Sequence, residues 1–477
     1  MNYKVIFNTL GWVLIIEAIC MIPALVCSVI YKESLTAMII SILLAFLVGF
    51  IMIKIPNQKK DMYAKEGFVA VALSWIVMSI FGAIPFVISG YIPNFFDAFF
   101  ETVSGFTTTG ASILTDIDAL PRGLIFWRSF THWMGGMGVL VFLVALLPLS
   151  GGSNVYLIKA ESPGPDVGKI VPKVKKTAMI LYGIYVVLTI IQMICLLISK
   201  MPLFDAITLT FGTAGTGGFA VRNSGFADYT SAQQLIITIF MIIFGVDFSF
   251  YYLLLIRKFS SAIKMEEVRT YLLIILTAIV MISMNCYNLY GNLFDTVKHS
   301  AFQVGSIITT TGFSTTDFDL WPEFSKAILV MLMFIGACAG STGGGIKVSR
   351  IMIFFKSIVK ELRIIAHPKR THKITLNGRI VEHEIARGVS VYIMAYIIIF
   401  AVSVLLISVD NFDFTTNFTG IAATINNIGP GLSGVGPTKN FSMYSNFSKV
   451  IFSLNMLFGR LEIFPMLVLF APNTWKK

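Results

Sequence analysis

Four short segments rich in glycine, threonine and asparagine carry the residues best suited to hold an ion. They are residues 104–111, 212–219, 307–314 and 424–431. Aligned by eye, they share the glycines Gly110, Gly217, Gly312 and Gly429. Glycine permits positive φ and close approach, so successive backbone carbonyls can point in one direction. Four such segments around one axis would present rings of carbonyl oxygens, which can replace the hydration shell of a weakly hydrated cation.

The side chains of these segments sharpen this prediction. Small polar residues precede the first three glycines, whereas the fourth segment has Asn-Asn-Ile. A single Gly/Thr-rich segment is usually only a turn, but four at equivalent places favour a pore that is pseudo-fourfold and built from one chain. The predicted potassium-binding filter residues are Thr108, Thr109, Gly110, Thr216, Gly217, Thr310, Thr311, Gly312, Asn427, Ile428 and Gly429.

A glycine-rich break interrupts an apolar stretch that follows the third segment. Residues 336–345 contain five glycines, and irregular backbone at membrane depth should line a cavity rather than lipid. Below a filter, such a loop could occlude the pore. The candidate gate residues here are Gly340, Ser341, Thr342, Gly343, Gly344 and Gly345.

Arg460 is a basic residue deep within the last apolar stretch, which also contains Lys449 near its start. It either faces the pore as a barrier to cations or pairs with Glu462. Residues two apart do not share a helix face, so the pore-facing position is favoured and Arg460 joins the candidate gate.

The composition requires that a membrane position these residues. Of the 477 residues, 56% are hydrophobic and 13% are charged, about half the charge density of a soluble domain. A span needs about 20 mostly apolar residues. Ten are predicted, at 6–30, 35–55, 68–90, 124–148, 178–199, 232–256, 269–290, 324–360, 386–409 and 443–470.

The net charge of +11 comes from basic residues in short loops between these spans. This pattern argues against a nucleic-acid partner and follows the positive-inside rule. The loops rich in Lys and Arg alternate with poor ones, which places both termini in the cytoplasm with an even number of spans.

An internal repeat organises the spans. Four times, a span is followed by a short amphipathic segment, a Gly-rich turn and a second span; the short segments are residues 94–106, 203–211, 293–307 and 414–423. The predicted fold is therefore an all-α integral membrane protein with two N-terminal helices and four helix–pore loop–helix repeats. The expected units are 1–66, 67–176, 177–267, 268–379 (with a broken second helix) and 380–477.

Acidic residues follow three of the pore segments, namely Asp116, Asp118, Asp228, Asp317 and Asp319. A negative outer vestibule would concentrate cations by focusing the field. Ordinary solvated loop residues explain each of them equally well, so both interpretations stay open.

Enzyme chemistry has no support in the sequence. The five cysteines form no CxxC motif, and the five histidines show no ligand spacing, so neither a bound cofactor nor a metal centre is expected. A secondary carrier would more often show two inverted halves with broken helices than four pore loops in the same sense.

These motifs resemble the Trk/Ktr/HKT superfamily of potassium transporters, and the TrkH branch most of all. The carrying motifs are residues 107–112, 135–138, 162–164, 215–219, 309–314, 340–347, 426–431 and 458–462. The two additional N-terminal spans favour the TrkH branch over the Ktr type, which resembles the four repeats without these two spans.

The resemblance implies potassium uptake across the bacterial cytoplasmic (inner) membrane, with potassium as the substrate. It also implies a homodimer with one pore per subunit, a cytoplasmic ring of TrkA-like nucleotide-binding subunits, and gating by the glycine loop with Arg460. A sodium-permeable protein or an ion-coupled cation symporter of the same superfamily remains the alternative.

Three ionisable residues depart from this pattern or lack a role. His132 stands where the family more often has an amide, and Asp247 stands where asparagine is expected. Asp247 either touches the ion path or caps a local network, the latter being favoured. Glu17 in the first span receives no transport role.

Overall fold

The computed structural model describes residues 1–55, 64–136, 138, 174–368 and 372–475, which are mostly helical. Within them, six helices are long and apolar enough to cross a membrane: α1 (Tyr3–Ile30), α2 (Thr36–Ile53), α3 (Ala64–Ile88), α8 (Val174–Ile198), α13 (Glu266–Tyr290) and α17 (His383–Ile407). Helices α10 (Ser231–Phe244) and α11 (Phe248–Leu255) add a seventh as a pair bent by 89°. The expected helical membrane fold is confirmed. The described strands are only β1 (Thr375–Leu376) and β2 (Arg379–Ile380), an antiparallel hairpin.

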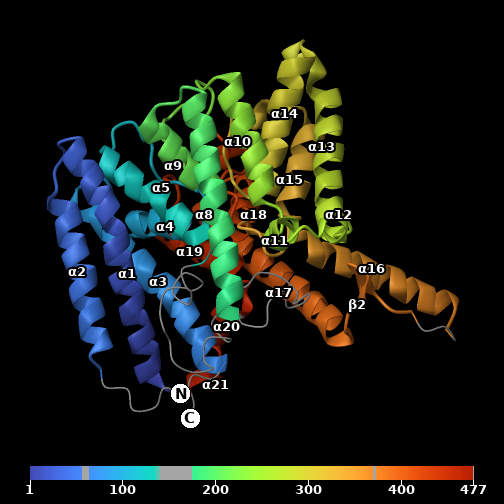
Figure 1. The fold of residues 1–477 in the computed structure, drawn as a ribbon, viewed down its shortest axis with the longest axis horizontal. Helices are drawn as coiled ribbons and strands as arrows, with labels where there is room; N and C mark the ends of the chain where they lie inside the picture. Colours follow the sequence, from blue (N-terminus) through green and yellow to red (C-terminus); the bar gives the residue numbers. More distant parts are fainter. Residues whose placement is uncertain (56–63, 137, 139–173, 369–371, 476–477) are drawn as a thin grey trace.

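Helices α1 and α2 form the N-terminal hairpin and lie at one edge of the molecule (Figure 1). They cross where Gly11 faces Gly49. A Cβ atom on Gly11 would lie 2.7 Å from the Gly49 carbonyl oxygen, and one on Gly49 would lie 2.8 Å from the Gly11 oxygen. Small residues thus allow the two backbones to touch, as is common between helices in membranes.

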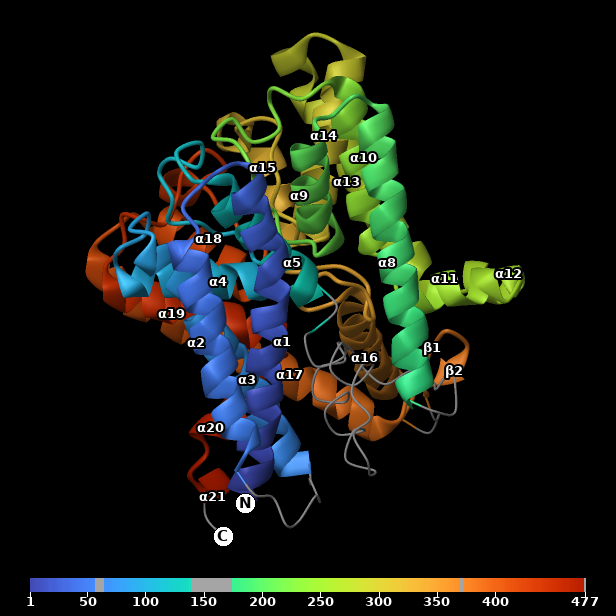
Figure 2. The same ribbon diagram turned by 60° about the vertical axis from the view of Figure 1, so that its left-hand side comes forward.

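The remaining helices follow the repeat. Each repeat has a long helix, a short pore helix, a turn and a second helix (Figures 1 and 2). The pore helices are α4 (Phe95–Phe106), α9 (Leu203–Ala214), α14 (Leu293–Ile308) and α18 (Phe414–Ile425). With 12 to 16 residues they are too short to span a bilayer. The second helices are α5 (Arg122–Gly136), α10 with α11, α15 (Glu323–Met333) with α16 (Val348–Ala366), and α19 (Asn446–Arg460).

Side-chain caps set where three of the pore helices begin. Asn94, Asn292 and Asp413 accept hydrogen bonds from the backbone N–H groups of Phe96, Phe294 and Thr416, respectively. Such caps satisfy donors that have no partner within the helix and stabilise its start by about 1 kcal/mol. They also fix which residues reach the far end, where each helix runs into its turn.

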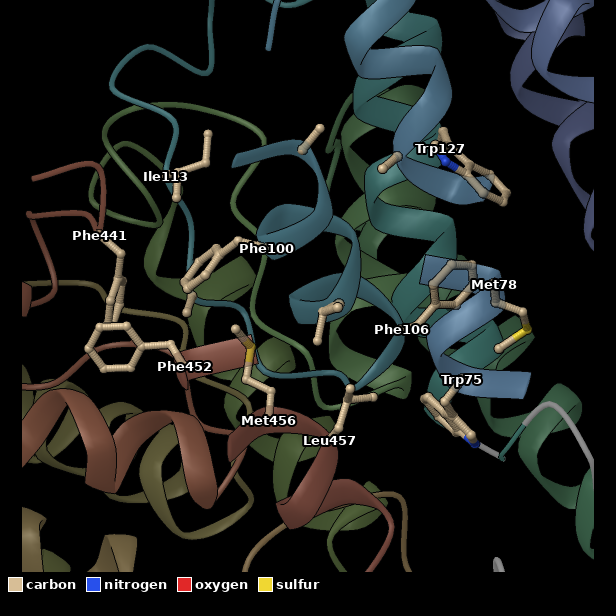
Figure 3. Close-up of a cluster of buried hydrophobic side chains, with 14 of the residues drawn as sticks. Trp75, Met78, Phe100, Phe106, Ile113, Trp127, Phe441, Phe452, Met456 and Leu457 are labelled. Atoms are coloured by element: carbon tan, nitrogen blue, oxygen red, sulfur yellow. The ribbon is translucent and has the colours of Figure 1, made fainter. Parts of the chain in front are cut away.

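An aromatic cluster holds the first pore helix in place (Figure 3). The Phe106 ring meets Trp127 edge to face at 6.0 Å, and Phe100 packs on Phe441 at 5.6 Å. Trp127 also donates a hydrogen bond to the Gly82 carbonyl at 3.1 Å. These rings tie α4 to its own repeat and, through Phe441, to the fourth repeat.

The second helices are less continuous than expected. The sequence predicts unbroken spans at 232–256 and 443–470, and that prediction is wrong for both. The first is broken after Gly245, where Asp247 accepts a hydrogen bond from Ser249 N at 2.8 Å and caps α11. This is the capping role favoured for Asp247. The second is broken before α20 (Phe464–Phe470), because Glu462 and Ile463 have positive φ of 58° and 67°.

The predicted break in span 324–360 is confirmed, although it is wider than residues 336–345. Helix α15 ends at Met333 and α16 begins at Val348. Of the predicted span 124–148, α5 covers the part to Gly136, and most of the rest lies outside the described residues. So does the predicted linker motif at 162–164.

The start of α1 and the last described helix, α21 (Pro472–Trp475), lie at the same end of the molecule, near α20 (Figures 1 and 2). This agrees with an even number of crossings. The smaller elements are α12 (Phe259–Ile263) and the 3₁₀ turns η1 (Phe318–Leu320), η2 (Ser408–Asp410) and η3 (Ser433–Val435).

Candidate ion filter and gate

Each pore helix ends in the same hydrogen-bonded turn. In each loop one backbone N–H group donates a hydrogen bond of 2.8 Å to the carbonyl oxygen five residues earlier; the donors are Thr109, Gly217, Thr311 and Ile428. In each turn the preceding residue has positive φ: Thr108, Thr216, Thr310 and Asn427, at 54° to 61°. This is the Schellman arrangement, which here marks equivalent residues in the four loops independently of their identity.

The shared turn corrects the alignment of the second loop. The following glycines with positive φ are Gly110, Gly218, Gly312 and Gly429. The equivalent of Gly110 is therefore Gly218 rather than Gly217, which corresponds to Thr109. The sequence alignment failed because Gly217 and Gly218 are adjacent, so their identity alone could not fix the register.

The residues with positive φ are unusual for their type. Threonine is β-branched, and a β-branched residue in the left-handed region is a conformational outlier that costs of order 1–3 kcal/mol. Three threonines nevertheless adopt it at equivalent positions, with φ of 55°, 54° and 61° for Thr108, Thr216 and Thr310. Strain repeated in this way marks a segment whose backbone shape serves a purpose beyond stability.

The four loops close into a ring. A Cβ atom on Gly110 would lie 2.1 Å from the Gly217 carbonyl oxygen, and one on Gly218 would lie 1.8 Å from that of Thr311. The same holds for Gly312 against Ile428 O at 1.9 Å and for Gly429 against Thr109 O at 2.8 Å. Each loop therefore contacts the next in the order one, two, three, four, one. No side chain other than hydrogen fits at these glycines.

Polar groups within the ring differ from loop to loop. Thr107 bonds Thr109 through their hydroxyls at 2.8 Å, as Thr309 bonds Thr311 at 2.7 Å. Asn427 donates to the Thr109 hydroxyl at 3.0 Å and so links the fourth loop to the first. Among the described residues, the buried Thr108 Oγ1 and Asn427 Oδ1 have no hydrogen-bond partner. Such oxygens are suited to a dehydrated cation.

A cavity of about 400 Å³ opens on one side of this ring. It is lined by all four glycines and by the segments that follow them, so it is the mouth of the filter. Its charged lining residues in the described part of the chain are Arg128, Asp317, Arg222 and Lys439. Of the five aspartates, for which a vestibule and an ordinary loop position were both left open, only Asp317 lines this cavity, which favours the ordinary loop position for the other four. Asp116 and Asp319, for example, instead accept hydrogen bonds from Asn223 and Ser433 N.

Two ion pairs that were not predicted from the sequence support the mouth; the first is buried, and in the second only the carboxylate is buried. Arg128 bonds Glu101 at 2.6 Å, with both side chains almost fully buried, and Glu101 also accepts from Ile113 N at 3.0 Å. Arg222 pairs with Asp205 of pore helix α9 at 2.7 Å. The available signal was a carboxylate inside each amphipathic segment, which is costly unless it is paired.

The glycine loop between α15 and α16 lies directly against the filter. Gly344 N donates to the Thr310 hydroxyl at 2.6 Å. A Cβ atom on Gly343 would lie 2.9 Å from the Thr309 oxygen, and one on Gly344 would lie 2.8 Å from the Asn426 oxygen. The predicted gate segment is thus brought to the third and fourth filter loops, on the side away from the mouth cavity.

The same loop is fastened to the break in the second repeat. Cys338 N donates to Gly245 O, and Phe248 N donates to Gly340 O, both at 3.0 Å. Glu267 of α13 holds both ends of the loop, because one carboxylate oxygen accepts from Ala339 N at 2.7 Å and from Ser349 N at 3.0 Å. Sequence analysis missed Glu267, since it stands at the start of an ordinary apolar span.

Two cationic side chains contact this loop. Arg460 donates to Thr342 O at 2.8 Å and to the end of α5, at the Gly136 carbonyl, at 2.9 Å. Lys347, which is almost fully buried, donates to Gly343 O. Glu462 forms an ion pair with Arg350. Arg460 therefore joins the first, third and fourth repeats, consistent with the predicted place at the gate.

Comparison with known proteins agrees with this geometry. The TrkH family model, described as a cation transport protein, matches residues 34–477. The chain is 38% identical to the Trk system potassium uptake protein TrkH of Salmonella typhimurium and 37% identical to that of Escherichia coli K12. Both matches cover 100% of each chain.

A solved structure matches equally completely. The crystal structure of the potassium transporter TrkH from Vibrio parahaemolyticus superposes with a TM-score of 0.88 at 30% identity, covering 100% of both chains. The chain therefore belongs to the TrkH family of cation transport proteins.

Proposed function

We propose that this protein takes up potassium across the bacterial cytoplasmic membrane through a gated, channel-like pore. The observation that carries the proposal is the closed ring of four equivalent loops, each with a glycine against the next loop's carbonyl. Carbonyl rings of this kind suit a weakly hydrated cation. The relatives named as potassium uptake proteins support potassium as that cation.

The proposed ligands are the backbone and hydroxyl oxygens of the filter residues predicted from the sequence, with Gly218 added. The units at 1–66, 67–176, 177–267, 268–379 and 380–477 are proposed as the N-terminal hairpin and the four repeats. Potassium is the substrate, and no resident cofactor is proposed.

The glycine loop is the proposed gate. It lies against the third and fourth filter loops, and the side chains of Lys347 and of the cation Arg460 contact its carbonyls. Fixed positive charge beside a filter opposes the passage of a cation. For ions to pass, the loop must therefore move and break its hydrogen bonds to Gly245 and Glu267.

The proposed assembly is a homodimer with a cytoplasmic ring of TrkA-like nucleotide-binding subunits, and both termini in the cytoplasm. Helix α16 supports a contact with another protein, because it exposes the apolar residues Phe355, Ile358, Val359, Leu362 and Ile365. Relatives of this chain are named as proteins of the Trk system, which supports partners from the same system.

Flux through purified protein in liposomes tests the function. Uptake of rubidium, potassium and sodium tracers is measured in liposomes that carry a potassium gradient. Protein-free liposomes are the control. Faster potassium and rubidium than sodium flux is expected. Equal sodium flux would favour the sodium-permeable alternative, and dependence on a proton or sodium gradient would favour the symporter.

Deleting residues 341–344 tests the gate in the same liposomes. The deletion removes the segment that contacts Arg460 and the filter, so potassium flux should rise. Flux equal to that of the intact chain would remove the gate hypothesis without touching the filter.

A further inference from the structure

His132 lies at the junction of the first and second filter loops, fully buried in α5. Its Nδ1 atom is 2.8 Å from Gly105 O, near the end of the first pore helix. Its Nε2 atom is 3.2 Å from Phe219 N, in the second loop directly after Gly218. The imidazole ring also packs on the Phe219 ring, with centroids 4.1 Å apart.

These partners specify the hydrogen-bonding roles of the ring. The Gly105 carbonyl can only accept and the Phe219 amide can only donate. Nδ1 must therefore carry the proton and donate to Gly105, while Nε2 accepts from Phe219. A neutral imidazole in this one tautomer satisfies both partners at once.

The second loop needs an external support of this kind. In the first and third loops, threonine pairs bond within the loop: Thr107 with Thr109, and Thr309 with Thr311. The equivalent positions of the second loop are Gly215 and Gly217, according to the shared turn. The second loop thus has no side chains with which to form the internal bond.

His132 occupies the space that those side chains would take. A Cβ atom on Gly217 would lie 2.2 Å from His132 Nδ1, and one on Gly215 would lie 2.1 Å from the His132 carbonyl oxygen. A side chain at Gly217 would therefore exclude the imidazole ring, whereas a side chain at Gly215 would overlap the backbone of α5 at His132.

The other repeats show that packing alone does not require a histidine here. Tyr185 OH donates to Trp133 O in the first repeat, and Tyr271 OH donates to Ile242 O in the same way in the second. Trp133 and Ile242 are therefore equivalent, and so are the residues that precede them, His132 and Met241. In the fourth repeat the equivalent is Met456, since Gly135 and Gly459 both lie against the last turn of their own pore helix. Methionine fills this position twice.

We propose that His132 is a positioning residue for ion selectivity: it holds the second filter loop through Phe219 N, in place of the threonine pair that braces the first and third loops. The proposal rests on the proposed function, since it assumes that the ring selects potassium. It predicts that the hydrogen-bonding capacity of residue 132, rather than its volume, sets selectivity.

The test compares the sodium-to-potassium permeability ratio of full-length variants in liposomes. His132→Met keeps a side chain that the fold uses at the equivalent positions but loses both bonds, so the ratio should rise about tenfold, the effect of about 1.4 kcal/mol. His132→Gln carries both a donor and an acceptor and should stay close to the unmodified protein. Met241→Leu is the matched control and should leave the ratio unchanged.

An unchanged ratio in His132→Met overturns the proposal, as does an equal rise in His132→Gln. Should the methionine variant not fold, His132→Asn replaces it, because the shorter amide keeps the donor near Gly105 but does not reach Phe219 N. A raised ratio in Asn but not in Gln then supports the brace, and equal ratios overturn it. Failure of the unmodified protein to select potassium would instead refute the proposed function.

Discussion

At the scale of single residues, the filter depends on what glycine lacks. Gly110, Gly218, Gly312 and Gly429 each have positive φ and each lie against a carbonyl of the next loop. Both constraints exclude a side chain, the first by backbone strain and the second by overlap with neighbouring atoms. Only glycine therefore leaves room for the carbonyl contacts that hold the four loops of the ring together.

Serine at Gly218 or at Gly110 should lower potassium-over-sodium discrimination by about tenfold or abolish flux. The serine Cβ would lie 1.8 Å from a carbonyl oxygen of the next loop at Gly218 and 2.1 Å from one at Gly110. In either variant that oxygen must move away. The permeability ratio in liposomes measures the effect. Gly183→Ser in α8 is the matched control, because no atom lies within 4 Å of its added Cβ. A normal ratio in the Gly218 variant would refute the corrected register of the second loop.

At the scale of elements, broken helices build the proposed gate. The bend between α10 and α11 exposes backbone groups that bind the glycine loop, and Asp247 stabilises the bend by capping α11. Glu267 at the start of α13 then fastens the two ends of the loop. The proposed gate of the third repeat thus contacts the second repeat, and its position in this structure depends on a few hydrogen bonds.

Glu267→Ala should raise basal potassium flux about tenfold. It removes two hydrogen bonds, each worth about 0.5–1.5 kcal/mol net, and so favours release of the loop. Initial rubidium uptake in liposomes is the measurement. Glu267→Gln is the control, since a single oxygen accepts both bonds and the amide oxygen can do the same. Unchanged or lower flux in the alanine variant, in protein of normal thermal stability, would contradict a restraining role.

At the scale of the whole molecule, the chain surrounds one path that has two different ends. The mouth cavity opens at the ring on one side, and the glycine loop covers it on the other. The start of α1 and the last described helix, α21, lie at one end of the molecule, near α20 (Figures 1 and 2). This asymmetry requires a defined orientation in the membrane, which the distribution of Lys and Arg in the sequence predicts.

Single cysteines in a cysteine-free background should reveal that orientation. Lys439 is exposed at the mouth, and Glu361 is exposed on α16. In intact cells, a membrane-impermeant maleimide should label Lys439→Cys and spare Glu361→Cys until the cells are permeabilised. Labelling in the reverse pattern would place the termini outside the cytoplasm.

The class of the molecule, the four repeats, the four glycine-rich segments and the break in the third repeat could all be predicted from the sequence. These follow from local signals: apolar length sets the spans, and clustered glycines end helices wherever they occur. The pore helices were within a few residues of their predicted ranges for the same reason.

The contacts between distant residues could be seen only in the folded structure. It moved the second loop's register from Gly217 to Gly218, because hydrogen bonding to the pore helix distinguishes adjacent glycines that composition cannot. It removed four of five aspartates from the lining of the mouth and brought in Arg128, Arg222 and Lys439. It also assigned partners to His132 and Glu267, whose contacts lie 27 to 87 residues away in the chain, a range at which sequence periodicity carries no information.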